Sequence, residues 1–243
     1  MKIIVRNLFL ICLILFNLQN NYTQPSGNTD PDFLKWKSYF NQIYGEDYNL
    51  MNGIRYINIY PSAEGHPFLG EDRFYQGNVV INNQLFRDVE IKYDICNQEI
   101  ILQYQHFSGG TDKIILVKEF IDEFVMDGKL FRKYNFPETV PGFYQVVSQS
   151  NIYCLYYWEK DLLKGSSVQS FYKYSPERKL SYLVIDNKLR SFKGRRSFVK
   201  LFPPEYHKDI MHFLKSNKIW IRDADEIKIR QLMAHCNKLI QGN

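Results

Sequence analysis

The chain has 243 residues, 45% hydrophobic residues and a formal net charge of +5. This length suits one large or two small hydrophobic cores, and the charge is too mild to indicate nucleic-acid binding by itself. The four cysteines contain no CxxC pair, which argues against a disulfide-stapled scaffold.

The N-terminus has the layout of a secretory signal peptide. Lys2 and Arg6 precede an uninterrupted apolar run at residues 8–16, and a polar stretch without periodicity follows. A buried N-terminal helix is the alternative, but a bilayer-spanning helix is not, because spanning needs about 20 apolar residues. We predict a signal peptide over 1–23, cleaved between Leu18 and Gln24. The mature protein is then expected in the periplasm, on the outer membrane surface or in the medium.

A linker and a helix are predicted for residues 24–45. The helix covers residues 31–44, starts at Asp30-Pro31 and ends at Gly45. Its apolar face carries Phe33, Trp36, Phe40 and Ile43.

Residues 46–194 predict an antiparallel β domain. Short apolar runs rich in Tyr, Phe and β-branched residues alternate with Gly, Asn or Asp turns, at a spacing of about 8–12 residues. The predicted strands are 76–81, 85–93, 99–105, 113–120, 122–127, 129–134, 143–149, 152–160, 167–174, 179–185 and 188–193. The predicted hairpin turns are Asn82-Asn83-Gln84, Asp127-Gly128, Ser150-Asn151 and Asp186-Asn187. The pattern indicates a mainly β (α+β) fold with sandwich or barrel-like sheets.

The C-terminal segment, residues 195–243, predicts helices. A helical turn is expected over 197–202, an amphipathic helix over 203–217 and a final helix over about 223–240. Asp223 to Glu226 resembles a capping box at the start of the last helix. The apolar stripes of the two longer helices are Tyr206, Ile210, Phe213 and Leu214, and Ile229, Leu232, Met233, Cys236 and Ile240.

Three cysteines, Cys96, Cys154 and Cys236, follow the predicted signal peptide. An oxidising compartment permits one disulfide among them, and the sequence does not indicate which pair. Three buried free thiols are the favoured interpretation, because free cysteine is among the most buried residue types.

The stretch 64–70, EGHPFLG, is the most site-like part of the sequence. His66 has Glu64, Glu71 and Asp72 nearby in the chain, and carboxylates can orient a histidine or share its proton. The candidate catalytic residues are therefore His66, Glu71 and Asp72.

A structural role for the same stretch is favoured over catalysis. Gly65 permits positive φ, and Pro67 keeps the preceding residue out of helical geometry. Phe68 and Leu69 can then enter the core and anchor a crossover between strands. No nucleophile or motif supports catalysis at this loop.

Other parts of the chain give weak signals for chemistry. The five histidines are scattered and no HExxH or P-loop pattern is present, so neither a metal nor a cofactor is expected. Asp94 and Glu99 are a carboxylate pair of the kind that glycosidases use, but turn formation is the favoured interpretation. The aromatic run at 152–160 leaves both faces of a strand apolar. Both faces are then covered by protein, or one binds a ligand such as a sugar.

The segment 188–200, KLRSFKGRRSFVK, carries six basic residues with interleaved phenylalanines. A solvated arm is the ordinary explanation of such a run, and an anion-binding patch is the functional one. The candidate binding residues are Arg190, Lys193, Arg195 and Arg196.

Three features together resemble an uncharacterised family of exported bacterial proteins. They are the GHPFL loop at 65–69, the KYD strand at 92–94 and the basic helical tail that begins at SFKGRR, residues 191–196. The resemblance covers roughly residues 33–241. It implies export and this order of elements, and it implies no activity or site residues. The stretch WIRDADE (220–226) departs from the more lysine-rich tail of the family.

The sequence therefore favours an exported, non-catalytic binding or envelope-associated protein. The alternative is a hydrolase that acts on an extracellular or envelope polymer. The expected partners are an envelope protein, a glycan or an anionic surface, and nucleic acid is not expected. The mature chain is predicted to lack a transmembrane helix, because no second apolar stretch is long enough.

Overall fold

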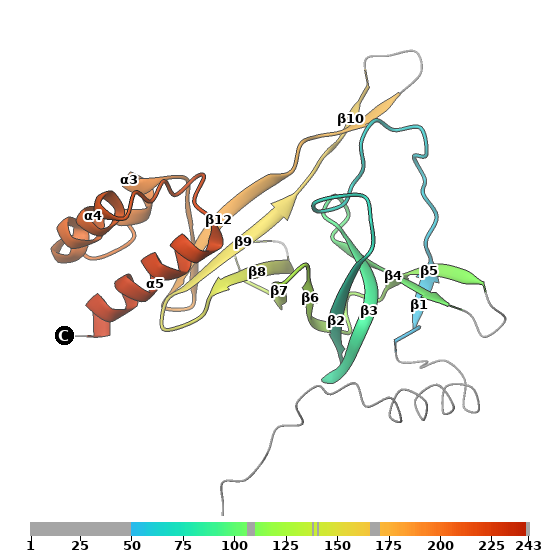
Figure 1. Cartoon of the computed structure of the whole chain (residues 1–243), viewed down its shortest axis with the longest axis horizontal. Helices are drawn as coiled ribbons and strands as arrows, with labels where there is room; N and C mark the ends of the chain where they lie inside the picture. Colours follow the sequence, from blue (N-terminus) through green and yellow to red (C-terminus); the bar gives the residue numbers. More distant parts are fainter. Residues whose placement is uncertain (1–49, 106–109, 138, 140, 166–170, 242–243) are drawn as a thin grey trace, which may run out of the picture. The chain divides into compact units, whose positions relative to one another are not determined.

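A computed structural model describes residues 50–105, 110–137, 139, 141–165 and 171–241 (Figure 1). The chain divides into two compact units, Met1–Glu46 and Asp47–Asn243, and all described residues belong to the second. The predicted signal peptide and the predicted helix over 31–44 lie outside the described residues.

The second unit is mainly β and antiparallel, as predicted. Eleven strands form one sheet in the order β1-β5-β4-β3-β2-β6-β7-β8-β9-β12-β13, and β10 and β11 form a separate hairpin. The strands of the sheet are β1 Gly53–Arg55, β2 Tyr75–Ile81, β3 Gln84–Asp94, β4 Glu99–Gln105, β5 Thr111–Leu116, β6 Ile121–Met126, β7 Lys129–Tyr134, β8 Gly142–Ser148, β9 Tyr153–Glu159, β12 Arg178–Ile185 and β13 Lys188–Phe192. The hairpin consists of β10 Leu162–Lys164 and β11 Tyr172–Tyr174.

Tight turns set the register of three strand pairs. The two-residue loops Asn82-Asn83, Asp127-Gly128 and Asp186-Asn187 join β2 to β3, β6 to β7 and β12 to β13. All six residues have positive φ, between 49° and 70°. Asn, Asp and Gly tolerate this conformation, and paired positive φ values match the twist of a hairpin. The turns predicted at Asp127-Gly128 and Asp186-Asn187 are confirmed. The first turn is Asn82-Asn83 alone, because Gln84 already belongs to β3. Ser150 and Asn151 lie in a longer connection between β8 and β9 and do not form a two-residue turn.

The first core lies on the concave side of the sheet, between side chains of strands β2 to β8. Tyr93 on β3 packs its ring against Phe131 on β7 and Phe143 on β8, with centroids 5.4 and 6.2 Å apart. β3 is not a neighbour of β7 or β8 in the sheet, so the stretch of the sheet from β3 to β8 closes one face on its own side chains. The barrel-like expectation describes this region, although the eleven strands remain one continuous sheet.

The second core lies between the C-terminal helices and the β8–β13 end of the sheet. These helices are α3 Arg195–Val199, the 3-10 turn η1 Pro204–Tyr206, α4 His207–Ser216 and α5 Glu226–Gln241. The apolar stripe of α5 is buried through Ile229, Leu232, Met233 and Cys236, as predicted. The opposite face of the same strands holds a third cluster, Phe136, Tyr144, Val146, Leu155 and Val184. Both faces of the aromatic run at 152–160 are therefore covered at its centre, where Cys154 and Leu155 are each at 0% exposure, while residues 157–160 are half-buried.

The structure corrects several element boundaries. The short strands β1 and β10 were not predicted, and the strand predicted over 113–120 ends at Leu116. A turn closed by the hydrogen bond from Phe120 N to Val117 O, 3.1 Å, ends it. The last helix starts at Glu226 rather than Asp223, because Asp225 caps it by accepting from Lys228 N at 2.8 Å. Of the strand predicted over 167–174, the structure shows β11, and residues 166–170 lie outside the described residues.

The three cysteines among the described residues are free thiols. Cys154 and Cys236 are buried in the second core, and burial raises the pKa of each to about 12. Both therefore behave as small apolar residues, which confirms the favoured interpretation for these two cysteines. Cys96 is half-buried, so the prediction of a third buried thiol is wrong. No described helix has the length and apolar character needed to cross a membrane.

A histidine at the α4–α5 contact makes stability depend on pH. The rings of His235 and Phe213 stack with centroids 4.1 Å apart, and burial lowers the pKa of His235 below 6.5. The unfolded chain then binds more protons than the folded one near this pH, so stability present above pH 6.5 is lost as pH falls through the lowered pKa. The variant His235→Phe keeps the stack and removes the titration. We expect wild type to lose more unfolding free energy than this variant between about pH 7.5 and 5.5 in urea titrations. Parallel losses would contradict the assignment.

Candidate functional site

Positive charge is concentrated in one segment of the chain. Residues 188–222 contain ten lysines and arginines but only two acids, Glu205 and Asp209. The whole chain has a net charge of +5, so the remaining residues carry a net charge of −3. The segment spans β13, α3, η1, α4 and the turns up to Arg222. The positive charge of the chain is therefore concentrated in this segment rather than spread over the whole surface.

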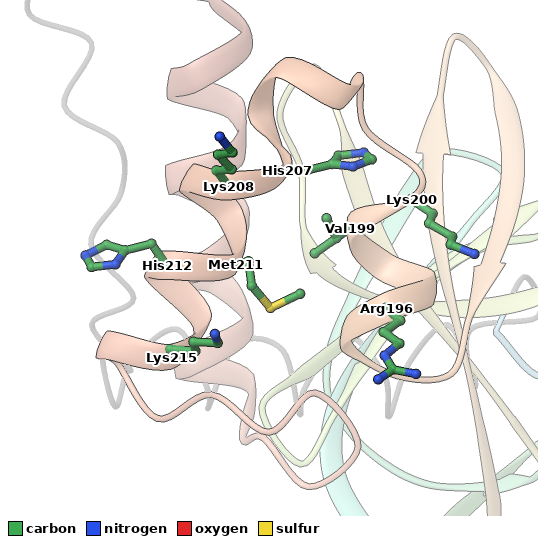
Figure 2. Close-up of a pocket in the computed structure, with 8 residues that line it drawn as sticks. All are labelled: Arg196, Val199, Lys200, His207, Lys208, Met211, His212 and Lys215. Carbon is green, nitrogen blue, oxygen red and sulfur yellow. The ribbon is translucent and has the colours of Figure 1, made fainter.

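An open depression of about 520 Å³ lies between α3 and α4. Figure 2 shows Val199 and Met211 between the two helices, with Arg196 and Lys200 on the α3 side. The residues that line it are Arg196, Val199, Lys200, His207, Lys208, Met211, His212 and Lys215. An apolar floor surrounded by cations suits a ligand that is anionic but not fully polar.

Helical spacing explains how these side chains come together. Residues 208, 211, 212 and 215 follow the i, i+3, i+4, i+7 pattern on α4, and residues 196, 199 and 200 follow i, i+3, i+4 on α3. Ile210 and Leu214 of α4 and Phe198 of α3 are buried in the second core. Burial of these faces leaves the cationic faces of both helices beside the depression.

A second depression, of about 500 Å³, adjoins the first and shares Arg196 with it. Its lining residues are Lys193, Gly194, Arg195, Arg196, Ser197, Trp220, Ile221, Arg222 and Asp223. The Arg195 guanidinium lies over the Trp220 ring at 4.1 Å, and its Nε donates to Ile219 O at 3.2 Å. Arg222 Nε donates to Lys193 O at 3.1 Å. Two of the cations are thus held in place by backbone carbonyls.

The cations of the two depressions lack acidic partners. We call them the basic face, defined as Lys193, Arg195, Arg196, Lys200, Lys208, Lys215 and Arg222. Within the described residues, no ion pair includes any of them. Some cations elsewhere are paired, since Arg178 contacts both Glu159 and Asp161 and Arg132 contacts Glu123. The basic face therefore keeps its charge available for an external anion.

The structure brings three of the four predicted binding residues together. Lys193, Arg195 and Arg196 line the second depression, and Arg190 lies on β13 opposite Leu183, outside both depressions. Lys208, Lys215, Trp220 and Arg222 were not among the predicted binding residues. The spacing of Lys208 and Lys215 on the predicted helix over 203–217 was a usable signal for the first two.

The two histidines of the first depression form hydrogen bonds with α4 itself or with the turn that precedes it. His207 Nε2 lies 2.8 Å from Phe202 O, and His212 Nε2 lies 3.3 Å from Ser216 Oγ. His207 thereby holds the turn before α4. In Figure 2, the His212 ring points away from the gap between the helices. These contacts assign the histidines a positioning role.

Ser197 and Lys200 have the SxxK spacing of some acyl-transfer enzymes, so the expectation that the chain contains no such pattern is wrong. The Ser197 hydroxyl accepts from Lys193 N and Gly194 N at 3.0 and 3.1 Å and bonds Gly194 O at 3.0 Å. No described hydrogen bond joins Ser197 to Lys200. Ser197 caps the start of α3 and is not activated as a nucleophile.

The EGHPFLG stretch is an anchor. Phe68 and Leu69 are 5% and 7% exposed, and Gly65 has φ +81°, which confirms the structural interpretation of these residues. Lys160 Nζ donates to the carbonyls of His66 and Phe68 at 3.1 and 2.8 Å and ties the loop to the end of β9. Burial first, and then the charge of Lys160, lower the pKa of His66 below 6.5. The neutral imidazole is favoured there.

The carboxylates near His66 are paired with other residues. Glu64 contacts Lys173 at 2.7 Å, Glu71 contacts Arg73 at 2.9 Å, and Asp72 contacts Lys92. His66 Nδ1 is buried without a hydrogen-bond partner among the described residues. The catalytic candidates His66, Glu71 and Asp72 are close in sequence, but the structure does not join them into an acid–base pair.

Asp94 and Glu99 pair across a turn. Asp94 is 2% exposed and accepts hydrogen bonds from Cys96 N and Asn97 N, both at 2.8 Å. Burial raises the pKa of both carboxyls. Asp94 is a turn former, as favoured from the sequence.

No three metal-ligating side chains cluster among the described residues. Comparisons with protein-family models, curated proteins and solved structures found no match to this chain.

Proposed function

We propose that this protein is an exported, non-catalytic binding protein associated with the bacterial cell envelope, and that its basic face binds an anionic partner. One observation carries the proposal. Seven cations surround two adjoining depressions, and the described residues offer none of them an ion pair. Like charges at close range repel one another, so a ligand that supplies negative charge is favoured at this surface.

A hydrolase centred on His66 is the less favoured function. Each nearby carboxylate, Glu64, Glu71 and Asp72, forms an ion pair with another residue. General acid–base catalysis needs a proton donor and acceptor within hydrogen-bond reach of each other or of the substrate. The geometry supports an anchoring loop rather than such a pair.

The proposed function predicts that removal of positive charge from the basic face weakens anion binding. In Lys200→Gln/Lys208→Gln/Lys215→Gln, we expect the affinity for fluorescently labelled dextran sulfate to fall by about tenfold, since exposed charge contacts contribute about 0.5 kcal/mol each. Fluorescence anisotropy at low ionic strength measures this, and added salt should weaken wild-type binding because it screens exposed charges.

A matched variant separates site binding from net charge. Arg87→Gln/Lys118→Gln/Lys164→Gln removes three exposed cations that lie outside the basic face. We expect its affinity to stay within about twofold of wild type, because distant charges are screened. Equal losses in both variants, or no wild-type binding, would refute the proposal.

A further inference from the structure

We infer that the partner of the basic face is the surface of a phospholipid bilayer that contains anionic lipids, and that Trp220 is its interfacial anchor. This inference rests on the proposed function and adds the chemical class of the partner. It starts from an observation that charge alone does not explain. Trp220 is 65% exposed in the middle of the cationic residues of the second depression.

The exposed position of Trp220 is fixed by its neighbours. Ile219 and Ile221 are 0% and 5% exposed and belong to the second core, so the residue between them must face outward. The hydrogen bond from Asp223 N to Trp220 O, 2.9 Å, closes the turn. Arg195 covers one face of the ring at 4.1 Å. Trp220 is thus a preorganised aromatic projection and not a loosely held side chain.

The combination of groups suits a membrane–water interface. Tryptophan is enriched at the headgroup level, where its apolar ring and polar N–H are both accommodated. Lysine and arginine bind lipid phosphates, and each near an anionic surface strengthens binding by about fivefold. A soluble polyanion would use the cations and leave the exposed indole without a role.

The charge around Trp220 is complementary to such a surface. The second depression contributes Lys193, Arg195, Arg196 and Arg222, and Asp223 is the one acid among the described lining residues of both depressions. Val199 and Met211 add apolar surface at the first depression. An array of phosphates can therefore meet cations in both depressions at once while the indole enters the interface.

Vesicle co-sedimentation of the mature protein, without the signal peptide predicted over 1–23, tests the inference, with dextran sulfate as the soluble probe. We expect at least about tenfold stronger binding to phosphatidylcholine vesicles with about one-quarter phosphatidylglycerol than to phosphatidylcholine alone. Trp220→Ala should weaken vesicle binding by about tenfold but keep dextran sulfate binding within about twofold, and Trp220→Phe should lie between. The matched control is Phe171→Ala, since Phe171 is 73% exposed and lies outside both depressions. This control should bind vesicles as wild type does.

The outcomes separate the inference from the proposed function. Vesicle binding that does not depend on Trp220, or dextran sulfate binding without vesicle binding, overturns the membrane inference and leaves a site for a soluble or protein anion. Binding to neither probe overturns both. Loss of vesicle binding in Trp220→Ala with dextran sulfate binding retained supports both.

Discussion

The variant Gly77→Ala is expected to lose about 3 kcal/mol of unfolding free energy. Gly77 lies on β2, the strand between β3 and β6, where a bulge interrupts its pairing. A Cβ at this position would lie 2.1 Å from Val125 O and 3.1 Å from Ile91 Cδ1. The first atom belongs to the backbone of the paired strand, so relief requires β2 and β6 to move apart. Urea unfolding monitored by circular dichroism measures the loss.

Two other glycines provide comparisons for the stability loss expected in Gly77→Ala. Gly110 has no atom within 4 Å of an added Cβ, so Gly110→Ala should change stability by less than about 0.5 kcal/mol. Gly53 would meet Ile115 O at 2.2 Å, but it lies on the three-residue strand β1, whose one partner in the described sheet is β5. Gly53→Ala should therefore cost less than Gly77→Ala. Wild-type stability in Gly77→Ala would show that the pairing of β2 with β6 is wrong.

The variant Asn237→Ala is expected to lose about 3 kcal/mol, for a different reason. Asn237 is 6% exposed on α5, and its Oδ1 accepts from Ile152 N at 2.9 Å. Its Nδ2 donates to Ile152 O at 3.3 Å and to Met233 O at 2.9 Å. The amide thus satisfies both backbone groups of a buried residue in the β8–β9 turn. Alanine leaves them buried and unpaired.

A second asparagine provides the control for this variant. Asn217 Nδ2 donates to Phe213 O at 2.9 Å, four residues earlier in the helix, but Asn217 is exposed. Water can replace its hydrogen bond, so Asn217→Ala should cost less than about 1 kcal/mol in the same urea titration. Asn237→Leu restores apolar volume without the hydrogen bonds and should remain destabilised. A stable leucine variant would show that packing, not hydrogen bonding, dominates at this position.

The sequence predicted those parts of the fold that depend on local chemistry. Asn82-Asn83, Asp127-Gly128 and Asp186-Asn187 adopt positive φ because of their own residue types, and the apolar stripes of α4 and α5 are readable from spacing alone. The strands β1 and β10 have three residues each, too few to show an alternating pattern. Their pairing depends on distant partners.

The candidate site was only partly predictable for the same reason. The basic run at 188–200 is visible in the sequence, but the depression forms only where α3 packs beside α4. The exposure of Trp220 follows from the burial of Ile219 and Ile221, and isolated residue types do not reveal which of three adjacent apolar residues faces outward. Asn237 gave no signal, because its partners at Ile152 lie 85 positions away.

β13 is the edge strand at one end of the described sheet, and the positive charge of Arg190 matters there. β13 pairs only with β12, so one side of its backbone has no neighbouring strand within the described sheet. Such a side is a template for strand addition by another chain and hence for aggregation. Lys188 and Arg190 are both exposed on this strand. A second copy that approaches edge to edge would bring like charges together, so these two cations act as gatekeepers that keep the sheet at its present width.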